Sequence, residues 1–248
     1  MFPKRKLLLF SLVALGIPLS LGRIAKASAE LSLSDGTTSV LIMDNMPGDA
    51  DPTLGSIRFT GTVGAFTGTF GTGTSKPFSG TGTQPQLAFT APDTTTTNLG
   101  GTLTILFGDT DFGPVQNGII NTHIGGTSIP FPPGANTLSL SSGQISYQTF
   151  MDATNLSLGL GNQLTSQGPF GGATFNDNLS GAVTFGENVS LTQEIVINQG
   201  PNMLTGFNST LRITSILTAP DGGSAFALLG GALAAMEVWR RRLRQRTS

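Results

Sequence analysis

The sequence predicts an all-β fold, an antiparallel β-sandwich or jelly-roll-like domain, placed between two terminal segments of different character. Apolar and polar residues alternate with a period of two in many short runs, and no window shows a clean helical period. Glycine, proline and asparagine separate these runs, as is typical of sandwiches. Charged residues make up only 11% of the chain, against about a quarter in an ordinary soluble domain. Exposed strand faces rich in threonine would explain this low charge.

The clearest alternation lies in residues 101–107, 189–197 and 210–217, and each of these runs predicts a strand with one apolar face. The residues predicted to face the core are Leu103, Ile105, Phe107, Val189, Leu191, Ile195, Ile197, Leu211, Ile213 and Leu217. Those predicted to face outward are Thr102, Thr104, Ser190, Thr192, Glu194, Arg212 and Thr214.

Weaker patterns predict strands at residues 39–43, 55–60, 63–70, 86–90, 119–124, 137–140, 144–151 and 179–185. Glycines within the strand patterns, at Gly61, Gly64, Gly68 and Gly71, predict bulges or thin sheet edges. The threonine run 94–97 follows Pro92-Asp93 and predicts a surface loop. No convincing linker divides the body, so residues 30–217 are predicted to form one ectodomain.

Charge is segregated along the chain. Five Lys/Arg lie in the first 29 residues and five more in the last nine, whereas residues 30–219 hold three basic and twelve acidic residues, a net charge of −9. An acidic body repels phosphate backbones, so nucleic acid is not an expected partner. Cysteine is absent, which excludes disulfides, thiolate metal sites and a cysteine nucleophile.

Residues 1–29 have the layout of a secretory signal peptide. A basic start at residues 4–6 precedes an apolar run at 7–21, and Ala27-Ser28-Ala29 supplies the small residues of a cleavage site. The alternative is an uncleaved anchor helix, but about 15 apolar residues are short for a span of roughly 20. We therefore expect export, with cleavage after Ala29.

Residues 218–248 have the layout of a membrane tail. An apolar stretch at 224–239 would make about 24 Å of helix, close to a hydrocarbon core of roughly 30 Å. Trp239 would lie at the interface, and basic residues favour the cytoplasmic side, which places the body outside. The predicted membrane stop consists of Arg240, Arg241, Arg242, Arg244 and Arg246.

The start of this tail resembles the PEP-CTERM class of sorting signals, in the variant built on Val-Pro-Asp-Ser/Gly-Gly-Ser. The chain has Ala219 in place of Val, followed by Pro220, Asp221, Gly222, Gly223 and Ser224. The resemblance implies recognition by an exosortase, a membrane transpeptidase of bacteria that make exopolysaccharide. It further implies cleavage near Asp221, after which the body is released or attached at the cell surface.

Two groups of aspartates are candidate calcium ligands, because calcium takes hard oxygen ligands from adjoining loops. One group follows a predicted strand at Asp109 and Asp111, and the other comprises Asp44, Asp49 and Asp51. The alternative is that these aspartates accept hydrogen bonds from their own turns. We favour this alternative, and no cofactor is predicted.

Enzymatic activity has little support. A glycosidase needs two carboxylates about 5–10 Å apart, for which Asp109, Asp111, Glu187 and Glu194 are the candidates. His123 is the only histidine, and no Gly-x-Ser-x-Gly sequence is present. We expect a non-enzymatic protein.

Carbohydrate binding is the main alternative to a purely structural role. Sugar platforms usually use exposed Trp or Tyr, whereas the body has no Trp and one tyrosine, Tyr147. Phe66, Phe70, Phe78 or Phe131 could substitute, although core positions explain them equally well. The expected function is a structural or adhesive role at the bacterial surface or in the exopolysaccharide matrix. A surface carbohydrate-binding module comes second and a carboxylate-pair glycosidase third.

Overall fold

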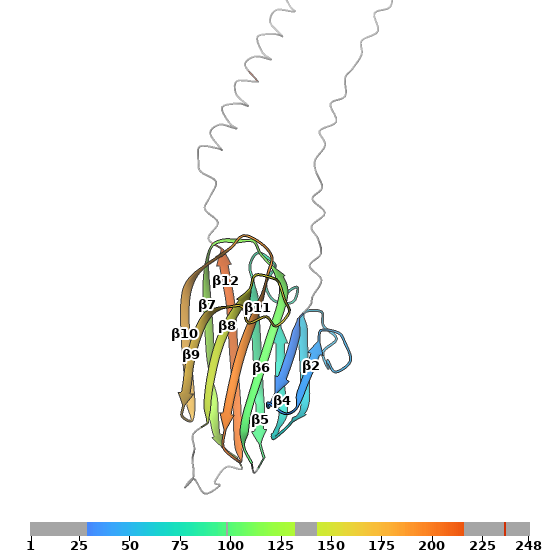
Figure 1. Cartoon of the computed structure of the whole chain (residues 1–248), viewed down its shortest axis with the longest axis vertical. Coiled ribbons are helices and arrows are strands. Elements are labelled where there is room, and N and C mark those ends of the chain that lie inside the picture. Colours follow the sequence, from blue (N-terminus) through green and yellow to red (C-terminus); the bar gives the residue numbers. More distant parts are fainter. Residues whose placement is uncertain (1–28, 98, 132–142, 216–235, 237–248) are drawn as a thin grey trace, which may run out of the picture.

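The computed structural model describes residues 29–97, 99–131, 143–215 and 236. Within residues 29–215, every regular element that it describes is a strand, and the strands form two six-stranded antiparallel sheets (Figure 1). The predicted all-β class is therefore confirmed. Several predictions lie outside the described residues: the signal peptide up to residue 28, Leu217, the strand at 137–140, and all of the tail except Met236.

The chain passes repeatedly from one sheet to the other. The first sheet has the order β2 (Ser39–Met43), β1 (Glu30–Ser34), β6 (Gly101–Phe112), β11 (Val189–Gln199), β8 (Gln144–Asp152) and β9 (Asn162–Gly171). The second sheet has the order β10 (Thr174–Phe185), β7 (Val115–Pro130), β12 (Met203–Ser215), β5 (Gln86–Thr96), β4 (Phe66–Thr74) and β3 (Ser56–Val63).

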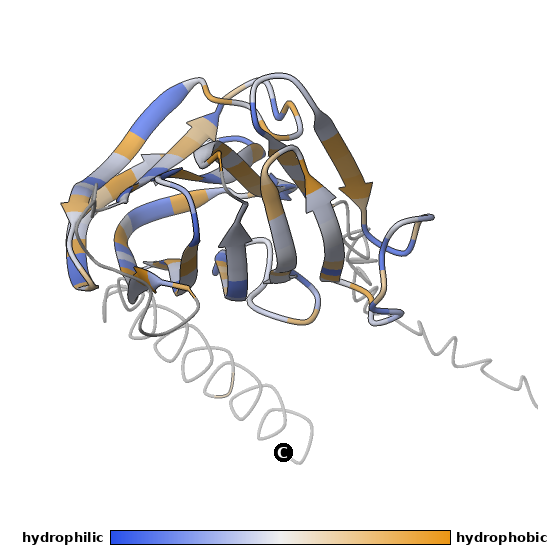
Figure 2. Cartoon of the chain, turned by 90° about the horizontal axis from the view of Figure 1, so that it is seen from below, coloured by the Kyte–Doolittle hydropathy of each residue, from blue (hydrophilic) through white to orange (hydrophobic). Residues whose placement is uncertain are grey.

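Phenylalanine rings fill much of the space between the sheets. Phe107 of β6 faces Phe89 of β5 across the core, with ring centroids 5.8 Å apart, and Phe89 also lies 6.0 Å from the ring of Phe207 in β12. All three side chains are buried. Figure 2, which looks along the strands, shows the two layers. Hydrophilic and hydrophobic residues mix along individual strands, as expected when one face of each sheet is buried and the other is exposed.

The strongest sequence patterns are confirmed. Leu103, Ile105 and Phe107 are fully buried, and Leu211 and Ile213 face the core while Arg212 and Thr214 are exposed. Ser190 and Thr192 lie on the outer face of β11 as predicted, but both are fully buried. The segment after β8 covers this outer face, and the Ser190 hydroxyl donates to the Leu156 carbonyl at 2.6 Å.

The threonine run predicted as a loop is part of a strand. β5 continues to Thr96, and both Thr94 and Thr96 are buried. The Thr96 hydroxyl donates to the Gly200 carbonyl at 2.8 Å and accepts a hydrogen bond from the Met203 N–H at 2.9 Å. Threonine is a good strand former because of its branched Cβ, so a run of four does not signal a turn.

The glycine-rich edge of the second sheet contains the predicted bulge. The register between β3 and β4 shifts at Phe59/Thr60, opposite Gly71 and Thr69. Gly68 and Gly71 have φ of 152° and 114°. A Cβ atom at Gly71 would lie 1.9 Å from the Thr90 carbonyl oxygen of β5. The close approach of two backbones therefore requires glycine here.

The first and last strands bring the two ends of the body to the same end of the sheets. Ser215, the last residue of β12, pairs with Gly118 near the start of β7, and Glu30 of β1 pairs with Gly108 near the end of β6. β6 and β7 are joined at that end (Figure 1). Ala29, the last residue of the predicted signal peptide, is buried there, and its carbonyl accepts a hydrogen bond from the Asp44 N–H at 3.1 Å.

Candidate functional site

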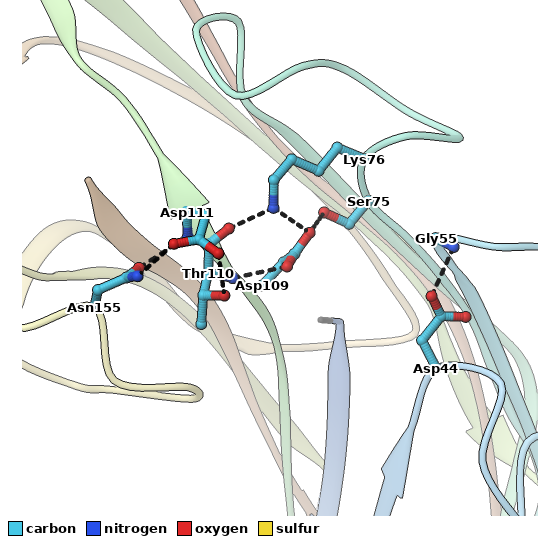
Figure 3. A network of polar contacts seen from close by, with 8 residues as sticks. All are labelled: Asp44, Gly55, Ser75, Lys76, Asp109, Thr110, Asp111 and Asn155. Atoms are coloured by element: carbon cyan, nitrogen blue, oxygen red, sulfur yellow. Dashed lines mark hydrogen bonds and ion pairs between the residues drawn. The ribbon is translucent and has the colours of Figure 1, made fainter. Parts of the chain in front are cut away.

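A buried ion pair joins the two sheets. Lys76 follows β4 of the second sheet, and Asp109 lies in β6 of the first sheet (Figure 3). The Lys76 Nζ atom lies 3.0 Å from Asp109 Oδ2, and the two side chains are 1% and 0% exposed. Such a pair is expensive to bury, so it persists only where further hydrogen bonds compensate the charges.

These further contacts are present around both charges. Asp109 Oδ2 also accepts a hydrogen bond from the Ser75 hydroxyl at 2.6 Å, and Oδ1 accepts one from the Thr110 N–H at 2.7 Å. The Lys76 ammonium donates to the Thr110 carbonyl and lies 4.3 Å from the centroid of the Phe112 ring. A fully buried Asp109 cannot meet a dissolved substrate, which argues against its role as a glycosidase carboxylate.

Asp111 belongs to a different contact, although it is only two residues from Asp109. Its Oδ1 accepts a hydrogen bond from Asn155 Nδ2 at 2.7 Å, and its N–H donates to Asn155 Oδ1 at 2.8 Å. Asp111 is exposed and has a φ of 58°, a conformation that aspartate and asparagine tolerate better than most residues. This reciprocal pair ties the end of β6 to the loop after β8.

The second aspartate group caps its own loop. Asp49 accepts hydrogen bonds from the N–H groups of Asn45, Asp51 and Arg58 at 2.9–3.0 Å. Asp51 accepts hydrogen bonds from the Thr53 N–H and the Ser56 hydroxyl. The bonds with Thr53, then the Ser56 bond and the charge of Arg58, lower the pKa of Asp51. This arrangement supports the turn-acceptor interpretation.

Asp44 completes this group. Its Oδ2 accepts a hydrogen bond from the Gly55 N–H at 2.8 Å. Partial burial is the main cause that raises the pKa of Asp44, and the charges of Asp49, Asp109 and Asp51 add to it. Across residues 29–97, 99–131 and 143–215, no three His, Asp or Glu side chains are grouped so that they could hold a metal ion. The five calcium candidates are therefore not brought together as a ligand set.

Substitution of Asp49 tests this interpretation. Asp49→Ala leaves three N–H groups of the loop without their acceptor, and we expect it to lower the free energy of unfolding by about 1–2 kcal/mol, as loss of a capping carboxylate does. Urea denaturation measures the change, with Asp177→Ala on β10 as the control. If the loop works through its own hydrogen bonds, a chelator will leave the wild-type midpoint unchanged; a fall in the midpoint on chelation would indicate a bound cation instead.

The aromatic candidates for a sugar platform are mostly in the core. Tyr147, Phe66 and Phe70 are fully buried. The Tyr147 hydroxyl donates to the Thr210 carbonyl at 3.0 Å across the sheets, and burial raises the Tyr147 pKa. Phe78 and Phe131 are 62% and 45% exposed. They lie in the β4–β5 connection and directly after β7, at opposite ends of the sheets, so they do not form one platform.

The remaining titratable candidates are dispersed. Glu194 lies on the outer face of β11, and burial raises its pKa. Glu187 is exposed in the turn before β11. His123 lies on the outer face of β7 between two asparagines, with Nδ1 3.1 Å from Asn178 Oδ1 and Nε2 3.1 Å from Asn208 Oδ1. His123, Asn178 and Asn208 thus form a polar row across three neighbouring strands. The sequence did not indicate this row, because it depends on the pairing of β10, β7 and β12.

Comparison with known proteins gives information on the tail. No curated protein matches the chain in sequence. Within the residues that the structure describes, no helix is long and apolar enough to cross a membrane, and the predicted helix at 224–239 lies outside them except for Met236. Residues 220–243 match the model of the VPDSG-CTERM motif. The chain thus carries a sorting tail of the PEP-CTERM kind, which indicates an exported, envelope-associated protein that an exosortase-like enzyme processes.

Proposed function

We propose that the protein is a structural or adhesive component of the bacterial surface or exopolysaccharide matrix. In this proposal, a signal peptide exports a β-sandwich ectodomain, and the helix at 224–239 with its arginines holds the chain in the membrane until the exosortase-like enzyme cuts near Asp221. The observation that carries the proposal is the VPDSG-CTERM match at residues 220–243.

The chemistry of the body supports a structural role. Asp49, Asp51, Asp109 and Asp111 accept hydrogen bonds that hold loops and strands in place. Charged residues make up only 11% of the chain, and its threonine-rich strands offer hydroxyl groups that can exchange hydrogen bonds with a neighbouring polymer.

Substitution in the tail tests the delivery step. In the native host we expect Asp221→Ala to accumulate as an uncleaved chain in the membrane fraction, because the substitution removes the acidic residue of the motif. Membrane fractionation and intact mass measure this, with Thr218→Ala, just outside the matched residues, as the control. Wild-type processing of Asp221→Ala would contradict the sorting step. The same spectra locate the mature N-terminus relative to Ala29.

A second candidate function is glycan binding, favoured by the polar row on the outer face of the second sheet. His123 with Asn178 and Asn208, together with the Ser180–Asn121 hydrogen bond of 2.7 Å, places amide and hydroxyl groups side by side on neighbouring strands. Such groups can pair with sugar hydroxyls. Binding of the chain to host exopolysaccharide, weakened by Asn208→Ala but not by Asn198→Ala on the other sheet, would support it. Equal binding by the two variants would count against it.

A further inference from the structure

We propose that Lys76 and Asp109 condense to an intramolecular amide bond, which links the two sheets covalently. The inference concerns the folded body and does not rest on the sorting function. It starts from the contact between Nζ and Oδ2, 3.0 Å apart with both side chains buried. The atoms that would bond are Nζ and Cγ, the carbon that carries Oδ2, and groups held side by side in a folded protein react far faster than the same groups free in water.

Burial of the pair is compatible with condensation. Burial removes the hydration that stabilises separated charges, so passage of one proton from the ammonium to Oδ2 is less opposed than in water. The Phe112 ring, 4.3 Å from Nζ, covers one side of the pair and limits the access of water to it. Exclusion of water also protects an amide bond, once formed, from hydrolysis.

The neighbouring groups suit each stage of the reaction. After the proton passes to Oδ2, the Nζ lone pair attacks Cγ, and the Thr110 N–H, 2.7 Å from Oδ1, stabilises the negative charge that develops there. One further proton leaves the nitrogen and reaches Oδ2 through the Ser75 hydroxyl, which already donates to that oxygen at 2.6 Å. Oδ2 departs as water. One C–N bond forms and one C–O bond breaks, so no oxidant, reductant or cofactor is required.

The product is also well accommodated. An amide has one N–H, for which the Thr110 carbonyl is in place as an acceptor, and one carbonyl oxygen, Oδ1, for which the Thr110 N–H is in place as a donor. A buried charged pair is thereby replaced by a neutral group with its hydrogen bonds satisfied. The bond would tie the β4–β5 connection of the second sheet to β6 of the first sheet.

Intact mass spectrometry of the full chain purified from the native host tests the proposal. We expect a mass lower by one water molecule than the mass of the processed sequence. Chymotryptic digestion should yield a branched peptide that contains both Lys76 and Asp109, identified by fragmentation. Trypsin is unsuitable because it does not cleave between Lys76 and Pro77, so Lys76 and Asp109 would remain in one linear peptide.

Matched variants identify the source of the lost water. The sequences Asp35-Gly36 and Asp221-Gly222 can also lose water, by forming a cyclic imide, but mild alkali reopens that imide and leaves an amide intact. Lys76→Arg keeps the positive charge and should show the full mass. An unreduced mass of the wild type, absence of the branched peptide, or persistence of the loss in Lys76→Arg would overturn the proposal. The peptide map of the wild type shows whether the Lys76–Asp109 amide bond is present even if Lys76→Arg does not fold.

Discussion

Replacement of Lys76 by methionine is expected to lower the free energy of unfolding by about 3–5 kcal/mol. The substitution removes the ammonium and leaves the carboxylate of Asp109, which has no exposed surface, without its positive partner. The Ser75 hydroxyl and the Thr110 N–H remain as donors, but hydrogen bonds alone do not repay the lost hydration of a charge. The same variant removes the amide bond proposed above. Urea denaturation monitored by circular dichroism measures the loss.

Two further variants separate the buried charge from the packing of its side chain. The double variant Lys76→Met/Asp109→Leu replaces the pair by apolar groups and should recover the part of the loss that comes from the unpaired buried charge, because a buried pair is often no more stabilising than hydrophobic residues of similar volume. The part that comes from the proposed amide bond would not be recovered. Arg212→Met changes an exposed cation and should stay within about 0.5 kcal/mol of wild type. Equal effects of Lys76→Met and Arg212→Met would show that the pair contributes little.

Gly71→Ala is expected to destabilise the protein by about 3 kcal/mol. The new Cβ would lie 1.9 Å from the Thr90 carbonyl oxygen, and backbone, unlike the end of a long side chain, cannot move aside cheaply. The φ of 114° adds strain for any residue with a Cβ. The midpoint of thermal unfolding measures this loss.

Gly186→Ala is the matched control for Gly71→Ala. Gly186 lies in the turn before β11, and a Cβ there would meet no atom within 4 Å. We expect a change of no more than about 0.5 kcal/mol. If both glycine variants unfold at the same temperature, the bulge in β4 accommodates side chains and the argument from close backbone approach is wrong.

The strands that sequence alone predicts are those with one apolar face. Residues 101–107 satisfy that pattern and form the centre of β6. β9 does not, because its buried residues are Thr165 and Gln167, which pair with the hydroxyls of Thr149 and Thr122. Alternation also fails where a loop covers the outer face of a sheet, as it does at Ser190. The alternation of polar and apolar residues shows which face of a strand is polar, but it does not show whether a loop covers that face.

The site was less accessible to prediction than the fold. The clustering of Asp44, Asp49 and Asp51 is visible in the sequence, yet the hydrogen-bond donors that occupy these carboxylates are backbone N–H groups, which every residue but proline has. Lys76 is one of only three Lys/Arg residues between positions 30 and 219, and this rarity could have marked it as a candidate partner for one of the many acidic residues. Its partner lies 33 residues away on the other sheet, so the pairing follows only from the stacking of the sheets.

In the proposed membrane-tethered form, the position of Ser215 sets which end of the body would point away from the cell. Because the tail follows Ser215, a chain tethered through it has that end of the sheets nearest the lipid. The opposite end then becomes the outermost surface. There the β5–β6 and β11–β12 loops are joined by the hydrogen bond from the Asn202 N–H to the Thr97 carbonyl at 3.1 Å, and the Phe131 N–H donates to the Asn202 carbonyl at 2.8 Å. In that tethered form these loops, with Phe131 beside them 45% exposed, would be the first part of the protein that a neighbouring cell or polymer meets.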